Sequence, residues 1–142
     1  MTPEMKAKLR HLLIVHEGYR QTLYHDSFGI PTIGIGRNLE SRGVLPTEID
    51  MMCDNDMQYF YNQLSEKFPW FLKLNDARQI ALIDMCFMGL KKFMSFKKMI
   101  AYLEQEDYPN AAIELLDSAY AKQVGNRAID LAAIIKLGYI PS

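Results

Sequence analysis

Apolar residues recur every three or four positions through the first part of the chain, which is the spacing of one face of an α-helix. Thr2 can cap this helix, Pro3 suits its first position, and Gly18 is a residue type that commonly ends one. The pattern therefore predicts a helix from Pro3 to just before Gly18. Its apolar side comprises Met5, Leu9, Leu12, Leu13 and His16.

Helical spacing also dominates the chain after Pro46. A long helix is predicted to begin at Thr47 and to end or break at Pro69, with an apolar face that comprises Ile49, Cys53, Met57, Phe60, Tyr61 and Leu64. Further helices are predicted over Ala77–Met88, Phe96–Leu103, Tyr108–Ala119 and Arg127–Leu137. The Ala77–Met88 segment is apolar on most sides, so we expect it near the centre of a helical lobe.

A different pattern separates the first helix from the others. Thr22–Tyr24 and Pro31–Gly36 favour β-strands, and Asp26–Gly29 between them is typical of a turn. Gly34 and Gly36 alternate along the second strand and leave bare backbone on one face, which indicates close approach of another group. Strands confined to one region and followed by helices indicate the α+β class rather than a parallel sheet.

The length of 142 residues suits one domain with two lobes. We expect an N-terminal helix and small antiparallel β lobe over about 1–46, a connecting helix over about 47–67 and a larger all-helical lobe over about 68–142. The net charge of −1 provides no basic field that would favour nucleic acid. The longest apolar run near the N-terminus, Leu12–Val15, is too short for a signal peptide or a membrane span. We therefore expect synthesis in the cytoplasm and no stable membrane insertion.

Two other residue types bear on cofactors. Cys53 and Cys86 each fall in an apolar helical pattern, which predicts buried, reduced thiols. His16 and His25 flank two acids, but the chain has no HExxH motif and no Cys/His cluster with ligand spacing. We therefore predict no metal and no cofactor.

The residues with the most chemical interest lie around the first helix and the β pattern. Eight residues separate Glu17 from Asp26, and five separate Asp26 from Thr32. Asp26 could simply be a turn residue that bonds its own backbone. Glu17 falls in the last turn of a helix, where the helix dipole disfavours a negative charge and so favours the protonated form that a general acid needs.

Glycoside hydrolysis uses two carboxyl groups of this kind. One stays protonated to donate to the leaving oxygen, and the other is ionised and stabilises positive charge, acts as nucleophile or activates water. A threonine hydroxyl beside the second acid could hold that water, because it can both donate and accept.

The segment HEGYRQTLYHDSFGIPTIGIG and the later segment from Ala81 to Ala128 together resemble the phage-type lysozymes, the endolysins of the T4 type. The family signature of an acid, an aspartate and a threonine falls on Glu17, Asp26 and Thr32. The resemblance spans nearly the whole chain. It implies a lysozyme-like α+β fold with an active-site cleft between the lobes. It also implies a muramidase that cleaves the β-1,4 bond between N-acetylmuramic acid and N-acetylglucosamine in peptidoglycan.

The resemblance implies a role for each site residue. Glu17 would donate the proton, Asp26 would be the second carboxylate, and Thr32 would place water. In the helical lobe it implies substrate contacts, which comprise Phe87, Gln123 and Asn126, although Phe87 could be plain core and Asn126 a helix cap. It also implies that Arg127 pairs with the catalytic glutamate and that Arg37 pairs with an acid at the position of Asp56.

Three features depart from the family pattern. Phe87-Met88-Gly89 is one amide-bearing residue shorter than in many relatives, and the Asn38–Pro46 connection is also short. The chain is not cationic overall. Its dense basic cluster, which comprises Lys91, Lys92, Lys97 and Lys98, could be a solvated helix face, a cell-wall contact or a nucleic-acid contact.

Two alternative functions follow from the same residues. A weakened homologue could act as a cell-wall-binding or structural module, and a lytic transglycosylase would need only the acid. For the favoured function, an endolysin in host-cell lysis, the partner is peptidoglycan. The expected protein is a monomer that a membrane pore protein, a holin, releases from the cytoplasm to the wall.

Overall fold

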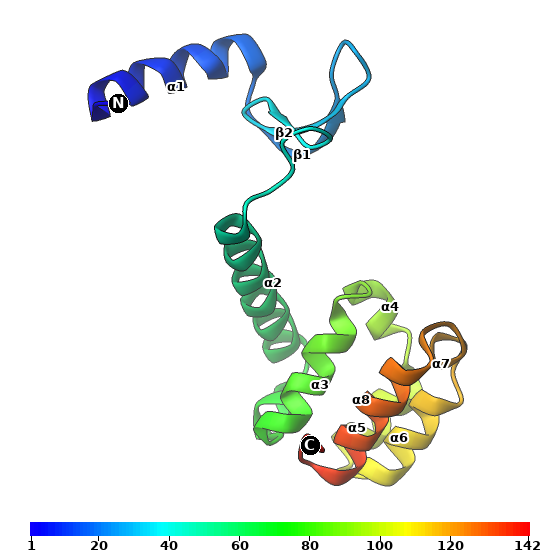
Figure 1. The fold of residues 1–142 in the computed structure, drawn as a ribbon. Helices are drawn as coiled ribbons and strands as arrows, with labels where there is room; N and C mark the ends of the chain where they lie inside the picture. Colours follow the sequence, from blue (N-terminus) through cyan, green and yellow to red (C-terminus); the bar gives the residue numbers. More distant parts are fainter. The chain divides into compact units, whose positions relative to one another are not determined.

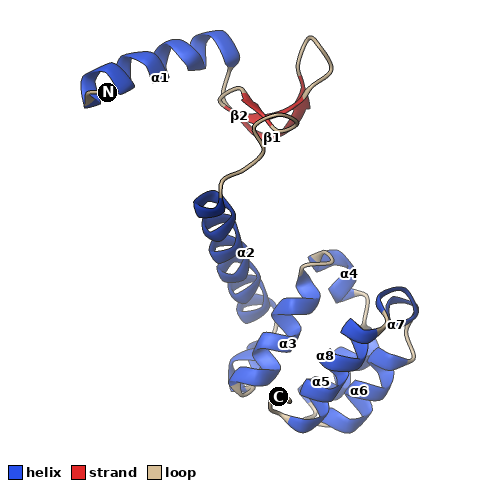
Figure 2. Ribbon diagram, in the orientation of Figure 1, coloured by secondary structure: helices blue, strands red, loops and turns tan.

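The structure, a computed structural model, describes all residues from Met1 to Ser142, which divide into two compact units, 1–52 and 53–142. All strands belong to the first unit, and the second unit is helical (Figures 1 and 2). The α+β class predicted from the sequence is therefore confirmed. The boundary between the units falls inside α2 (Pro46–Lys67), the helix that the sequence pattern predicted as the connection.

The first unit begins with α1 (Pro3–Glu17), whose ends are those expected from the sequence. The Thr2 hydroxyl accepts a hydrogen bond from the Met5 amide at 3.1 Å, which satisfies one of the free N–H groups of the first turn. Gly18 ends the helix at φ +85°, a conformation that residues with a Cβ rarely adopt. The chain therefore leaves α1 directly after Glu17.

A three-stranded antiparallel sheet follows, in the order β1 (Arg20–His25), β2 (Pro31–Gly34), β3 (Arg37–Asn38). Thr32 in the middle strand lies opposite Tyr24 on β1 and Asn38 on β3. The sequence pattern had extended the second strand to Gly36 and placed Asn38 in a connection, so β3 was not predicted. In the structure Gly34 and Gly36 have φ of +70° and +68°, so the chain turns between them and pairs back on itself.

The second unit contains the C-terminal part of α2 and a series of shorter helices. The elements after α2 are a 3₁₀ helix η1 (Pro69–Lys73), α3 (Asp76–Cys86), α4 (Leu90–Met94), α5 (Lys97–Glu104), α6 (Tyr108–Leu116), α7 (Ala119–Val124) and α8 (Asn126–Leu137). α6 packs against both α5 and α8, and α8 packs against α3 (Figure 1). The core between them comprises side chains such as Leu82, Met85, Phe93, Leu103, Leu115 and Ile135, all at most 1% exposed.

The second unit departs from the sequence pattern in three places. The helix predicted over Tyr108–Ala119 ends at Leu116, and a separate, unpredicted helix α7 begins at Ala119, where the Ser118 hydroxyl caps it by accepting from the Ala121 amide at 3.2 Å. The short α4 was not predicted, since five residues give no clear period. Cys86 is buried as expected, but Cys53 is exposed; within α2 only Leu64, near the C-terminal end, is buried.

One polar contact group fastens α3 to the end of α8. The Arg78 guanidinium donates to the carbonyl of Ile135 at 2.7 Å and to that of Lys136 at 3.1 Å. It also lies over the Tyr108 ring at 3.5 Å from the ring centroid. These carbonyls belong to the last turn of α8, where no backbone N–H of the same helix is available to them. This turn also carries the negative end of the α8 dipole, which favours a cation. A single side chain therefore connects the starts of α3 and α6 with the end of α8.

Candidate active site

Glu17 is the last residue of α1 and is exposed. Its backbone carbonyl accepts a hydrogen bond from the Tyr24 hydroxyl at 3.4 Å, which ties the helix end to β1. Its side chain lies against Gly36: a Cβ built on that glycine would be 2.9 Å from Cγ of Glu17. The close approach expected from the alternating glycines is therefore found, and the group that approaches is the predicted acid.

Asp26 forms the turn between β1 and β2. Its Oδ1 accepts hydrogen bonds from the amides of Phe28 at 2.8 Å and Ile30 at 2.9 Å, while its carbonyl accepts from the Gly29 amide at 2.9 Å. This is the side-chain-to-backbone arrangement that the structural interpretation of Asp26 predicted. It uses only one carboxylate oxygen, because Oδ2 makes no hydrogen bond within the protein.

Thr32 is the one buried polar residue and is 4% exposed. Its hydroxyl donates to the carbonyl of Ile30 at 2.8 Å. Since the amide of the same Ile30 donates to Asp26, one backbone residue links the aspartate and the threonine. The hydroxyl proton is engaged in this bond, so the Thr32 oxygen is left to accept a hydrogen bond from a water or a substrate hydroxyl.

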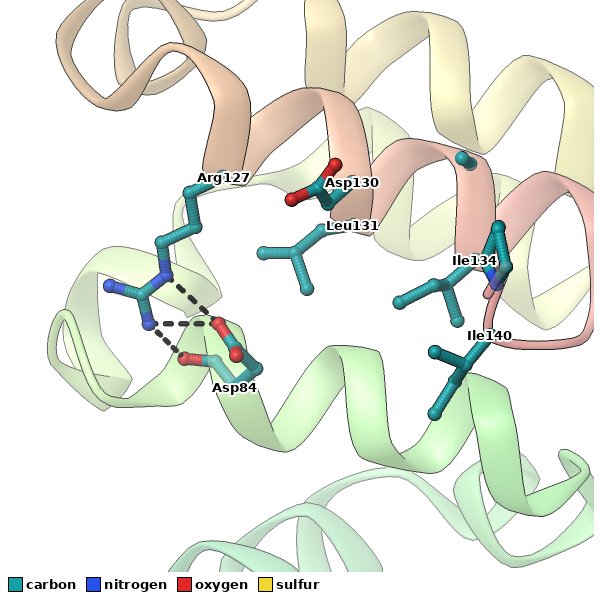
Figure 3. A pocket seen from close by; sticks show the side chains of 8 residues that line it. Asp84, Arg127, Asp130, Leu131, Ile134 and Ile140 are labelled. Atoms are coloured by element: carbon teal, nitrogen blue, oxygen red, sulfur yellow. Dashed lines mark hydrogen bonds and ion pairs between the residues drawn. The ribbon is translucent and has the colours of Figure 1, made fainter.

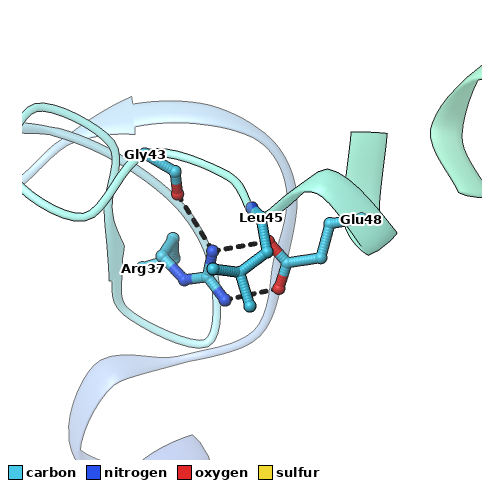
Figure 4. A network of polar contacts seen from close by, with 4 residues as sticks. All are labelled: Arg37, Gly43, Leu45 and Glu48. Atoms are coloured by element: carbon cyan, nitrogen blue, oxygen red, sulfur yellow. Dashed lines mark hydrogen bonds and ion pairs between the residues drawn. The ribbon is translucent and has the colours of Figure 1, made fainter. Parts of the chain in front are cut away.

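Arg37 has a different partner from the predicted Asp56. Its guanidinium forms a two-point ion pair with Glu48, at 2.8 and 2.7 Å, and also donates to the carbonyl of Gly43 at 2.9 Å (Figure 4). Glu48 accepts a further hydrogen bond from the Leu45 amide at 2.7 Å, as a glutamate at the third position of a helix commonly does. The predicted Arg37–Asp56 pair is therefore wrong, because α2 itself presents Glu48 in its first turn.

This ion pair changes the titration of its carboxylate. The hydrogen bonds from Arg37 and from the Leu45 amide lower the pKa of Glu48 from 4.5 to about 2. The side chains of Arg37 and Glu48 are 28% and 35% exposed, so solvent screens the attraction. The network fixes the segment from β3 to the start of α2, and β3 pairs with β2, the strand that carries Thr32.

The second unit holds the other predicted residues. Phe87 follows α3, is 44% exposed and packs against Phe60, with ring centroids 5.2 Å apart. Gln123 lies near the end of α7, and Asn126 is the first residue of α8; both are exposed. Asn126 is not a cap, since Gly125 occupies that position and no side chain closes the helix end. Contact of these residues with substrate stays a prediction.

Arg127 has a partner inside the second unit that sequence reasoning missed. Its guanidinium donates to the Asp84 carboxylate, with Nε 2.9 Å and Nη2 2.8 Å from Oδ1, and to the Asp84 carbonyl at 2.9 Å (Figure 3). The positive end of the α8 dipole disfavours the cation Arg127 at the start of that helix, and the negative end of the α3 dipole disfavours the anion Asp84 in its last turn. Each residue offsets the other, and this pair of opposite anomalies was the signal available in the sequence.

The Asp84–Arg127 pair lies at the edge of a pocket of about 520 Å³ between α3, α8 and the C-terminal residues (Figure 3). Its other lining residues include Asp130, Leu131, Ile134 and Ile140. Hydrogen bonding to Asp84 raises the pKa of the Arg127 guanidinium. Pairing of Arg127 with Glu17, which the family resemblance implied, stays a prediction.

None of the helices is long and apolar enough to cross a membrane. No group of three or more His, Cys, Asp or Glu side chains is gathered as a metal ion would require.

Comparison with known proteins identifies the family. A model of the phage lysozyme family matches residues 15–132, which include Glu17, Asp26, Thr32 and Arg127. The chain is also similar to probable T4-type lysozyme 1 of Dictyostelium discoideum, with 24% identity over 165 aligned positions that cover 94% of this chain and 96% of the relative. Probable T4-type lysozyme 2 of the same organism is 24% identical over 164 positions, with 94% and 96% covered. The chain therefore belongs to the phage lysozyme family.

Proposed function

We propose that this chain is a muramidase that hydrolyses the β-1,4 bond between N-acetylmuramic acid and N-acetylglucosamine in peptidoglycan. Membership of the phage lysozyme family supports a lysozyme-like peptidoglycan hydrolase. The observation that carries the finer proposal is the arrangement of Glu17, Asp26 and Thr32 in one small unit, at a helix end and on the hairpin that follows it. Glu17 donates the proton to the leaving oxygen.

Asp26 and Thr32 share the task of handling water. Two amides hold Oδ1 of Asp26, so the carboxylate is oriented while Oδ2 is left to accept a proton or to stabilise positive charge. The Thr32 oxygen can accept a hydrogen bond from the same water, because its own proton is bound to Ile30. Both acceptors are fixed by the backbone of the hairpin, which reduces the entropy lost when substrate binds.

Asp84 contributes by giving Arg127 a carboxylate partner. A guanidinium beside Glu17 would favour the ionised form of that acid and would oppose proton donation. The Asp84–Arg127 bonds give this guanidinium a carboxylate partner within its own unit. We propose that Asp84 holds Arg127, that Arg127 supports the catalytic glutamate, and that Phe87, Gln123 and Asn126 contact the substrate.

The experiment is clearing of a peptidoglycan suspension, followed by turbidity between about pH 4 and 8. Glu17→Gln keeps the shape of the side chain and removes the acid, so we expect a loss of at least ~100-fold. Glu40→Gln, at another exposed glutamate of the same unit, is the matched control and should clear at the wild-type rate. No clearing by the wild-type chain at any pH would favour a cell-wall-binding module instead.

A second candidate function, lytic transglycosylase, is supported by one observation. The two amide bonds to Oδ1 account for the presence of Asp26 as a turn residue, and a transglycosylase requires only the acid Glu17. Analysis of the released sugars distinguishes the two reactions. Reducing N-acetylmuramic acid ends indicate hydrolysis, whereas 1,6-anhydro ends would assign the transglycosylase.

The biological setting that fits this activity is that of an endolysin. On this proposal the protein is made in the host cytoplasm and reaches the cell wall only after a holin opens the membrane. Expression in a Gram-negative host tests it. We expect lysis only when a holin is expressed with the chain, and lysis by the chain alone would indicate another export route.

A further inference from the structure

We propose that Gly36 is a positioning residue for Glu17: the missing side chain at this position is what allows the acid to lie where it does. The inference rests on the proposed function for the role of Glu17, but the contact itself is a property of the fold. It concerns two residues that are nineteen positions apart in sequence and belong to different elements, the end of α1 and the turn between β2 and β3.

The contact extends along the whole glutamate side chain. A Cβ built on Gly36 would lie 3.0 Å from Cβ of Glu17, 2.9 Å from Cγ and 3.1 Å from Cδ, the carboxyl carbon. Real Cβ atoms essentially never approach another heavy atom within 3.0 Å. Any residue other than glycine would therefore push the side chain of Glu17 from its place.

The backbone on both sides limits how this clash could be relieved. Glu17 is followed by Gly18, where the chain turns out of α1, and its carbonyl is bound by the Tyr24 hydroxyl. Gly36 precedes Arg37, whose side chain is fixed by Glu48 and Gly43. Because both backbones are tied, the Glu17 side chain from Cγ to the carboxyl group is the part that would move.

Displacement of the carboxyl matters because proton donation requires a near-exact position. A glutamate side chain has three rotatable bonds, and an exposed one samples many rotamers. Packing along a bare peptide removes part of that freedom before substrate arrives. A misplacement of about 1 Å at a catalytic group can cost ~100-fold in rate.

The chain offers a matched control two residues earlier. Gly34 has φ +70° and Gly36 has φ +68°, so alanine at either position is strained by the same kind of left-handed φ. A Cβ on Gly34 would meet nothing within 4 Å, whereas one on Gly36 would meet Glu17. The difference between Gly34→Ala and Gly36→Ala therefore isolates the contact with the acid.

The activity experiment compares these two variants with Glu17→Gln on peptidoglycan fragments. We expect Gly36→Ala to lower kcat by ~10- to 100-fold, to leave KM within about twofold and to change the pH dependence of kcat. Gly34→Ala should stay within about threefold of the wild type in kcat. Equal activity of the two glycine variants, with Glu17→Gln inactive, would overturn the positioning role and leave the proposed function intact.

A structural readout keeps the inference testable without activity. NMR couplings of the Glu17 side chain should indicate one dominant rotamer in the wild-type protein and averaging in Gly36→Ala, with Gly34→Ala unchanged.

Thermal unfolding in a Glu17→Ala background provides a second check, because that change removes two of the three atoms in contact. Gly36→Ala should lower Tm less in this background. An averaged Glu17 in the wild type, or an equal loss of Tm in both backgrounds, would overturn the inference; an inactive wild type with an ordered Glu17 would overturn only the proposed function.

Discussion

Substitution of Asp26 separates its part in the turn from its part in the chemistry. Oδ1 holds two amides, at 2.8 and 2.9 Å, and Oδ2 is free. Asp26→Asn keeps an oxygen that can accept both amide bonds and removes the charge. Asp26→Ala removes the oxygen as well. The two variants therefore differ in the turn but not in the lost carboxylate.

The magnitudes follow from those two bonds. Hydrogen bonds to a charged group contribute about 1.5 to 3 kcal/mol when buried. The Phe28 amide is exposed and can bond water instead, whereas Ile30 is half-buried. We therefore expect Asp26→Ala to lower the free energy of unfolding by about 2 kcal/mol and Asp26→Asn by less than about 1 kcal/mol. In activity, both should lose ~100-fold or more, because each removes the base.

Thermal unfolding and turbidity clearing measured on the same preparations provide the test. The reasoning is refuted if Asp26→Asn, folded and nearly as stable as the wild type, clears peptidoglycan at close to the wild-type rate. Asp26 would then be a turn residue only, and the transglycosylase assignment would gain support. Equal stability of the Asn and Ala variants would instead show that the two amide bonds contribute little to the fold.

Two further predictions concern stability. Arg78→Ala should lower the free energy of unfolding by about 2 to 3 kcal/mol, because it removes two hydrogen bonds to carbonyls and a cation–π contact with Tyr108. Arg78→Lys should recover only part of this loss, because lysine lacks the planar guanidinium. Chemical denaturation measures the free energy of unfolding of both variants. The Arg37–Glu48 pair should stabilise the fold above about pH 4.5 and lose its effect as the pH falls toward the folded-state pKa of about 2, since that pKa is lowered from 4.5. Denaturation between about pH 2 and 6 should therefore show a smaller slope for Glu48→Gln, and an unchanged slope would contradict the assignment.

The sequence predicted most helices because their apolar faces and caps are local signals. Thr2 and Gly18 mark the ends of α1 as expected, and Pro69 follows the end of α2. α4 was missed because a five-residue helix is too short for periodicity to show. β3 was missed because its position depends on the left-handed conformation of Gly34 and Gly36, which a sequence permits without requiring.

The candidate site residues were proposed from the sequence, whereas most of their contacts were not. Glu17, Asp26 and Thr32 were chosen because their spacing matches the family signature, and their catalytic roles stay predictions. The Ile30 link between Asp26 and Thr32 is made by backbone atoms and leaves no trace in side-chain identity. Asp84 was overlooked because its unfavourable place in the last turn of α3 indicates a partner but does not say which one, and packing decides that it is Arg127. Glu48 had a local signal that pointed to it: proline at the first position of α2 and glutamate at the third are typical of a capped helix start.

The Ile30 link also bears on how such sites are recognised across related chains. Ile30 serves Asp26 through its N–H and Thr32 through its C=O, so neither bond depends on which side chain it carries. Almost any residue could replace it with both bonds intact, and proline alone would remove the donor. The position therefore holds two site residues together without requiring a particular side chain for either bond. Its role is visible in the hydrogen-bond geometry and not in the residue type.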